Sequence, residues 1–189
     1  MKSIRLYVKD SCSDKMFEYP CFNSNTNFLG GKKVSVFGDN CEGIVDYLKL
    51  YNAVVTLNPS NKETSFSQIG IVLPKGAADN TEEGYYQILD YYVETLQLLI
   101  HEQSGVDEFT HIVVVLPPHS DEIGISFIKM AYYAVYGLIK GLGEINAPRR
   151  VFINGIILNE ETNESILKDW IRLLSSNNSN NIIGQVIKL

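Results

Sequence analysis

Residues 110–118, THIVVVLPP, place five consecutive aliphatic residues between a polar start and two prolines. A near-continuous apolar run of this kind is typical of a parallel β-strand that is covered on both faces, because neither face meets water. Five further runs have the same character: KKVSVF (32–37), AVVTL (53–57), QIGIVLP (68–74), VFINGIIL (151–158) and IIGQVIKL (182–189). The sequence therefore predicts a mostly parallel sheet of about six strands.

Helical segments alternate with these strands. A turn and a short helix fit residues 38–52, and two long helices fit residues 80–103 and 121–146. This alternation predicts a doubly wound, Rossmann-like (flavodoxin-like) α/β fold with helices on both faces and right-handed crossovers. Only about ten residues separate the runs at 53–57 and 68–74, which is too few for a helix, a strand and their loops. One βα unit is therefore expected to be missing at an edge of the sheet.

The 189 residues predict one domain over residues 31–189 and an N-terminal extension over residues 1–30. Within the extension, IRLYV (4–8) fits an edge strand, and CFNSNTNFLGG (21–31) reads as a loop.

The net charge of −6 and the lack of long Lys/Arg runs argue against a nucleic-acid partner. No apolar run is long enough to span a bilayer. The three cysteines form no CxxC pair, which favours a reduced, cytoplasmic protein without a metal site.

Two C-terminal segments carry a resemblance to a known family. GLIKGLGEINAPRRVFINGIILN (137–159) and NIIGQVIKL (181–189) resemble the short-chain dehydrogenase/reductases, particularly the ketoacyl-acyl-carrier-protein reductase branch. That family runs from a helix through "APR" into a strand and ends on a "GQV" strand. GKKVSVFGDNCEGIV (31–45) lies where the family has its first strand and glycine-rich turn. The resemblance covers residues 31–189 and implies a Rossmann-like domain that would bind NAD(P).

The cofactor-binding positions depart from the family pattern. Gly38 and Gly43 could supply two of the glycines of a phosphate-binding turn, but their spacing is one residue too long, and the third position is Val45. Asn58 stands where an acidic residue would bind the ribose, and LPKGA, with Gly76, replaces the "NNAG"-type turn. We therefore expect no cofactor. If one binds, NAD(P) is expected at Gly38, Gly43, Asn58 and Gly76.

The catalytic positions are also in question. Tyr136 and Lys140 are four residues apart and share one helical face, and with Ser120 they form a candidate catalytic triad. Counted back from the end of the helix, however, Tyr136 is only about 15 Å above the start of the next strand, too low for the edge where ligands bind. Aligned on GLIKGLG, the resemblance instead places the family's tyrosine and lysine at Ile128 and Tyr132. We therefore expect no catalytic residue.

The two long helices are rich in tyrosine, which suggests a subunit interface. Aromatic rings with polar tips are favoured at interfaces, and in the family the corresponding helices form a four-helix interface between subunits. The candidate interface residues are Tyr85, Tyr92, Leu96, Tyr132, Tyr133 and Tyr136. The alternative is ordinary amphipathic packing with phenols that face solvent.

Three functions remain open. The abbreviated sheet is most similar to the shortened, catalytically degenerate N-terminal domain of the high-molecular-weight ketoacyl reductases. The first hypothesis is therefore a non-catalytic protein that forms a homodimer, or a heteromer with an active short-chain reductase. The second is an active NAD(P)-dependent oxidoreductase that uses Ser120, Tyr136 and Lys140. The third is an acyl- or nucleotide-binding module that uses a cleft at residues 38–43 and 74–76.

Overall fold

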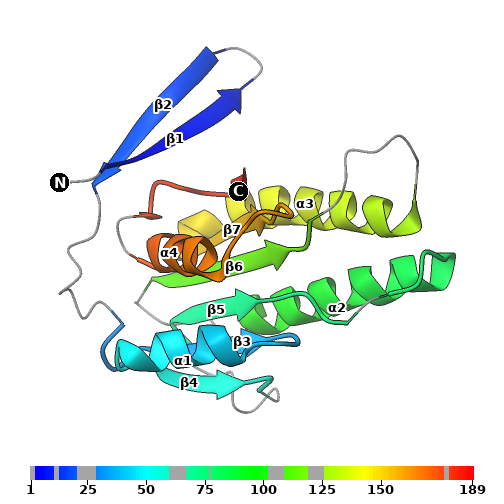
Figure 1. Cartoon of the computed structure of the whole chain (residues 1–189), viewed down its shortest axis with the longest axis horizontal. Coiled ribbons are helices and arrows are strands. Elements are labelled where there is room, and N and C mark those ends of the chain that lie inside the picture. The colour runs from blue at the N-terminus through cyan, green and yellow to red at the C-terminus, as the bar shows by residue number, and fades with distance from the viewer. Residues whose placement is uncertain are drawn as a thin grey trace.

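The computed structural model describes residues 3–10, 13–20, 29–59, 67–76, 78–101, 109–118, 126–176 and 179–189, and for 3–10 and 13–20 the backbone alone. A six-stranded parallel sheet with the order β4-β3-β5-β6-β7-β8 runs through the centre (Figure 1). Its strands are β3 (Lys33–Phe37), β4 (Val54–Leu57), β5 (Ile69–Val72), β6 (Thr110–Leu116), β7 (Val151–Ile157) and β8 (Val186–Lys188). The predicted doubly wound α/β fold is confirmed.

The central strands form because their apolar runs are covered on both faces. Every residue of β5, β6 and β7 is buried, whereas β4 and β8, at the edges of the sheet, are partly exposed. Strands β6 and β7 pair along their full length, from Thr110 opposite Val151 to Leu116 opposite Ile157. The run THIVVVLPP thus marks a strand at the centre of the sheet, as its composition predicts.

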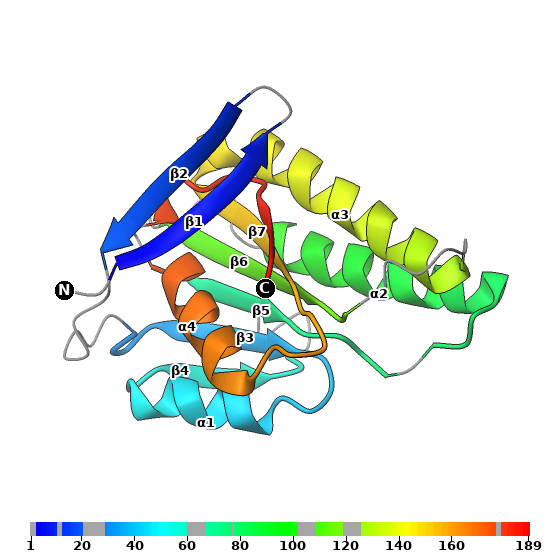
Figure 2. The same ribbon diagram turned by 45° about the horizontal axis from the view of Figure 1, so that its top comes forward.

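Helices cover both faces. Helices α2 (Glu82–His101) and α3 (Phe127–Asn146) pack on one face, and α1 (Glu42–Leu50) and α4 (Glu164–Leu174) on the other (Figures 1 and 2). Ser126 caps α3, because its hydroxyl accepts a hydrogen bond from the backbone N–H of Lys129 at 3.1 Å. Helix α4 was not among the helices expected from the sequence.

The last crossover differs in hand from the others. The chain steps from β5 to β6, β7 and β8 in one direction across the sheet. Helices α2 and α3 connect the first two steps on one face, but α4 connects the third on the opposite face. The β7–α4–β8 crossover therefore has the opposite hand from the others, so right-handed crossovers throughout were a wrong expectation.

Contacts between α1 and α4 hold α4 on this face. At successive helical turns they pair Gly43 with Glu164, Tyr47 with Lys168, and Tyr51 with Arg172. The Nζ atom of Lys168 lies 5.8 Å from the ring centroid of Tyr47, and the Cζ atom of Arg172 lies 5.1 Å from that of Tyr51. Cations over aromatic rings stabilise such contacts. The two helices thus run side by side in register.

The first two strands lie outside this sheet. Strand β1 (Ser3–Asp10) pairs with β2 (Ser13–Pro20) as a separate antiparallel hairpin. The strand expected at residues 4–8 is thus present, but in a hairpin and not at the edge of the main sheet. Between β4 and β5, the described residues 58–59 and 67–68 contain no helix. Among the described residues, no helix is long and apolar enough to cross a bilayer.

Candidate functional site

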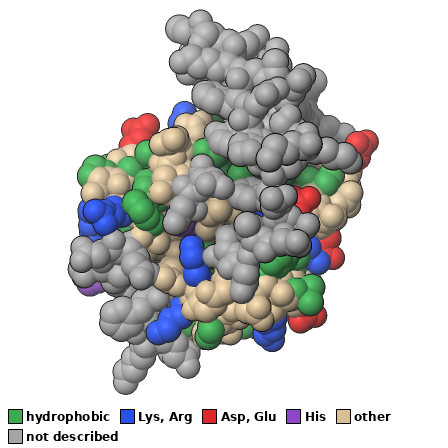
Figure 3. All heavy atoms as spheres, turned by 90° about the vertical axis from the view of Figure 1, so that its left-hand side faces the viewer, with side chains coloured by type: hydrophobic (Ala, Val, Ile, Leu, Met, Phe, Trp, Pro, Cys, Tyr) green, Lys and Arg blue, Asp and Glu red, His purple; other side chains and the backbone are tan. Residues whose placement is uncertain are grey.

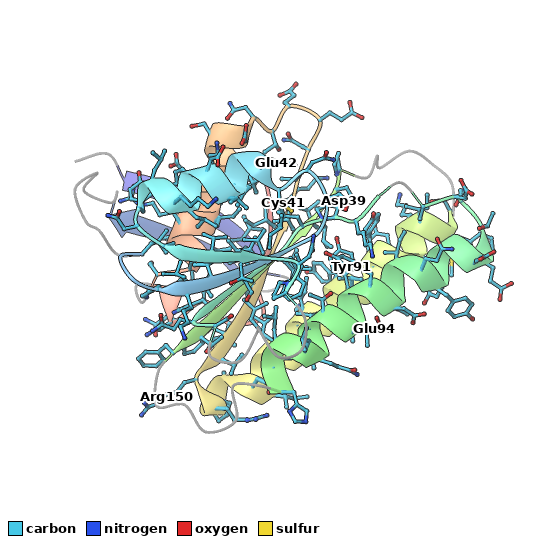
Figure 4. All side chains as sticks on the ribbon, turned by 90° about the horizontal axis from the view of Figure 1, so that it is seen from below. Asp39, Cys41, Glu42, Tyr91, Glu94 and Arg150 are labelled. Atoms are coloured by element: carbon cyan, nitrogen blue, oxygen red, sulfur yellow. The ribbon has the colours of Figure 1, made fainter. Side chains whose placement is uncertain are left out.

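The crevice between the carboxyl ends of β3 and β5 is the candidate site. After β3 the chain turns to α1 on one face, and after β5 it turns to α2 on the other. Doubly wound sheets bind ligands at such a switch point. Figure 4 shows Asp39, Cys41 and Glu42 at the start of α1 with Tyr91 of α2 on the same side of the molecule, while Arg150 lies at the far end.

The turn after β3 is held by its own neighbours. Gly38 has a φ of 118°, and a Cβ atom added to it would lie 2.6 Å from the carbonyl oxygen of Leu73, so only glycine fits. The N–H of Gly38 donates a hydrogen bond to Oδ1 of Asn58 at 3.0 Å, and Nδ2 of Asn58 donates to the Gly38 carbonyl at 3.3 Å. Asn58, at the expected ribose position, thus serves to fix the turn.

Asp39 bridges the crevice. Its backbone N–H donates a hydrogen bond to the carbonyl of Pro74 at 3.1 Å. Its carboxylate oxygen Oδ2 accepts a hydrogen bond from the N–H of Gly76 at 2.8 Å. These two bonds join the turn after β3 to the segment after β5. Gly38 and Gly76, which the sequence singled out, thus lie in two segments that Asp39 joins within the chain.

Gly43, the second expected phosphate-turn glycine, packs against α4. A Cβ atom added to Gly43 would overlap the carboxylate of Glu164, which would then have to move aside; that side chain is 57% exposed and has room to do so. Lys168 pairs with the same carboxylate at 2.8 Å. The lack of a side chain at residue 43 therefore admits Glu164 of the neighbouring helix.

The carboxylates of Asp39, Glu42 and Glu164 lie near the start of α1. Burial, then the carboxylates of Glu42 and Asp39, raise the pKa of the Cys41 thiol, which donates a hydrogen bond to the Gly38 carbonyl at 3.1 Å. Figure 3 shows the opposite side of the molecule, where Lys and Arg as well as Asp and Glu side chains lie among apolar ones. The described residues contain no group of three or more side chains suited to a metal ion.

The phenols near the carboxyl edge are engaged in structural hydrogen bonds. Tyr91 donates to the carbonyl of Leu73 at 2.9 Å, and Tyr92 donates to the carbonyl of Val115 at 3.0 Å. Burial is the main cause that raises the pKa of Tyr91, Tyr92 and Tyr132 above the ordinary value of 10.0. A group that transfers protons near neutral pH needs the opposite shift.

Tyr136 and Lys140 lie on α3, further from the carboxyl edge of the sheet than Tyr132. The Nζ atom of Lys140 is 5.7 Å from the ring centroid of Tyr136, so the pair does meet in space. The carbonyl of Lys140 packs against Gly184, whose N–H bonds to Ile153, the third residue of β7. Lys140 is therefore about 13 Å below the carboxyl end of β7, and Tyr136 about 7 Å. Ser120, the third member of the candidate triad, lies outside the described residues.

Half of the candidate interface residues face inward. Tyr92, Leu96 and Tyr132 belong to the core between the sheet and helices α2 and α3, and Tyr92 is only 1% exposed. They cannot present a surface to a partner, because the apolar stripe of each helix is used to cover the sheet. Tyr85 and Tyr136 are half-buried, and Tyr133 is 55% exposed. Only the outward part of the expected set is therefore open to a partner.

No family model matches the chain, and no curated protein matches its sequence. Solved structures do share its fold. A short-chain dehydrogenase from Mycobacterium smegmatis is 14% identical with a TM-score of 0.68, over 89% of this chain and 95% of that one. The enoyl-[acyl-carrier-protein] reductase (NADH) from Aquifex aeolicus VF5 is 14% identical with a TM-score of 0.68, over 85% and 95%. BdcA, in complex with NADPH, is 11% identical with a TM-score of 0.63, over 87% and 94%.

This chain therefore has the fold of the short-chain dehydrogenase/reductases, and at 189 residues it is shorter than a full member. In such a fold the pyrophosphate of a dinucleotide lies at the turn between the first strand and its helix. Here Asp39 spans that crevice, and Glu164 lies against the glycine of the first helical turn. The carboxylate of Asp39 in that turn opposes an anionic pyrophosphate, because like charges repel.

The sequence reasoning missed both carboxylates. Asp39 directly follows Gly38 in the candidate phosphate-binding turn, so its acidic side chain could have been recognised from the sequence as unfavourable for a phosphate group. Glu164 carried no such signal, because its contact with Gly43 depends on which face of the sheet α4 covers.

Proposed function

We propose that this protein is a non-catalytic member of the short-chain reductase fold that acts by association, either with a second copy or with an active short-chain reductase. The observation that carries this proposal is the state of two phenols near the carboxyl edge of the sheet. Tyr91 and Tyr92 donate to backbone carbonyls, and burial raises the pKa of each phenol, which makes both poor proton donors and acceptors near pH 7.

The outward face of α3 supports association. Tyr133 is 55% exposed, Met130 46% and Phe127 42%, and Tyr86 adds an exposed ring on the neighbouring helix α2. Exposed aromatic residues and methionine are enriched at interfaces. A Cβ atom added to Gly137 would contact nothing, so this part of α3 offers open space to the surface of a partner.

Sedimentation equilibrium tests the association. The wild type is expected to form a dimer, or to bind a ketoacyl-type reductase, and Tyr133→Glu is expected to weaken that association at least about tenfold. Leu50→Glu is the matched control, because Leu50 is 80% exposed on α1, across the sheet from α3. A wild type that stays monomeric at high concentration and binds no reductase would contradict the proposal, as would equal effects of the two substitutions.

The second candidate is an active NAD(P)-dependent oxidoreductase with displaced residues. The closeness of Lys140 to the ring of Tyr136 favours it, and two of the similar structures are named with NADH or NADPH. This candidate predicts NADPH oxidation with a ketoacyl thioester and loss of that turnover in Tyr136→Phe. The proposed function predicts no turnover in the wild type.

A more specific relationship and a cellular location are also proposed. We propose that the chain corresponds to the degenerate N-terminal domain of the high-molecular-weight ketoacyl reductases and works in the cytoplasm. The shortened sheet supports the first point, and the free thiol of Cys41 is consistent with the second.

A further inference from the structure

The switch-point crevice is crossed by the chain's own hydrogen bonds. Asp39 takes part in two of them, as a backbone donor to Pro74 and as a carboxylate acceptor from Gly76. The neighbouring turn packs directly on the segment after β5, because Gly38 sits against Leu73 with no space for even a Cβ atom. The Asp39 carboxylate thus fastens the two sides of the crevice together.

Two further carboxylates, of Glu42 and Glu164, lie near the start of α1, which follows the turn that contains Asp39. The start of α1 carries partial positive charge, which favours an anion there. Its capping residue, Cys41, makes no side-chain hydrogen bond to the helix. Glu42 lies in the first turn, and Glu164 of α4 contacts Gly43 one residue further on. Carboxylates of this chain therefore stand beside the position that favours an anion.

We infer that Asp39 closes the switch-point crevice and that Glu164, beside the start of α1, adds negative charge to it, so that the crevice excludes anions such as pyrophosphate. Lys75 stands beside it, with Nζ 5.7 Å from the ring of Tyr91, but Lys168 already pairs with Glu164. The negative charge thus exceeds the positive charge at this point. Like charges at contact distances in water oppose each other by about 1 kcal/mol per pair, or roughly fivefold in affinity.

The closure rests on the non-catalytic function proposed above, and the test separates the two. Inorganic pyrophosphate is titrated calorimetrically into the wild type and into Asp39→Ala/Glu164→Ala. The wild type is expected to show no saturable binding, and the double variant is expected to bind at least about tenfold more tightly. Asp46→Ala/Asp169→Ala is the matched control, because it removes two exposed carboxylates further along the same two helices. This control is expected to behave as the wild type.

Each outcome decides the question. Equal pyrophosphate affinity in the wild type and the double variant, or no binding by the folded double variant, would overturn the closure, and neither result bears on turnover. NADPH turnover by the wild type would instead overturn the proposed function. Amide exchange of Gly76 gives a second readout in Asp39→Ala alone. The N–H of Gly76 is expected to exchange at least about tenfold faster once its acceptor is gone, and unchanged exchange would overturn the bridge.

Discussion

Replacing Tyr92 with phenylalanine is expected to destabilise the protein at pH 8 and to make it slightly more stable than the wild type at pH 11. At pH 8 the substitution removes a buried hydrogen bond of 3.0 Å to the carbonyl of Val115, which costs about 1 kcal/mol. Burial raises the pKa of Tyr92 far above its ordinary value of 10.0, so the folded protein keeps this proton when the unfolded chain has lost it. The stabilisation is therefore present below pH 10 and is lost as the pH rises.

The size of the loss follows from that shift. At pH 11, ionisation of a phenol with a pKa near 10 stabilises the unfolded chain by about 1.4 kcal/mol. Tyr92→Phe escapes this loss, so its stability relative to the wild type should change by about 1.4 kcal/mol between pH 8 and pH 11. Urea unfolding followed by circular dichroism measures both values. Tyr86→Phe is the control on the same helix, since Tyr86 is 52% exposed. A difference for Tyr92→Phe that does not change with pH would refute the reasoning.

Three further predictions concern glycine and cysteine positions. Gly38→Ala should lower the free energy of unfolding by about 2–4 kcal/mol, because the backbone there has a positive φ and the added Cβ would lie 2.6 Å from a carbonyl oxygen. A loss below about 0.5 kcal/mol in urea unfolding would contradict this prediction. Gly141→Ala should raise it by about 0.5–1 kcal/mol, because the position is helical with open space around it, and a loss of stability would count against that geometry. In a variant with Cys12 and Cys21 replaced by serine, Cys41 should react with a disulfide reagent at pH 8 at least about tenfold more slowly in the folded protein than in guanidinium. The reason is that burial and nearby carboxylates raise the pKa of the Cys41 thiol. Equal rates in the two conditions would show that the thiol is accessible in the folded protein.

The strands could be predicted because each carries its own signal. A buried parallel strand such as β6 needs an unbroken apolar run, and that run is visible in the sequence without knowledge of its neighbours. Helix α4 also carried a signal. Asn163 caps it, and apolar residues recur at helical spacing at Leu167, Trp170, Ile171 and Leu174. Its face could not be predicted, because the usual hand of a crossover gives the wrong answer here.

The site was harder to predict than the fold. The sequence showed that the glycine-rich turn departs from the family pattern. It could not show the hydrogen bonds of Asp39 to Pro74 and Gly76, because they join residues far apart in the chain. The interface prediction was limited for a similar reason, because the sequence does not show which tyrosines of a helix are buried. A helix such as α2 has tyrosines on several sides, and only tertiary packing decides that Tyr92 faces the sheet while Tyr86 faces outward.

The most direct test is a calorimetric titration of the wild-type protein with NADPH at low ionic strength, where repulsion between charges is least screened. We expect no saturable binding up to about 1 mM, because Asp39 spans the crevice where the pyrophosphate would lie and Glu164 adds negative charge beside it. Saturable binding with a Kd of about 10 µM or tighter would contradict it.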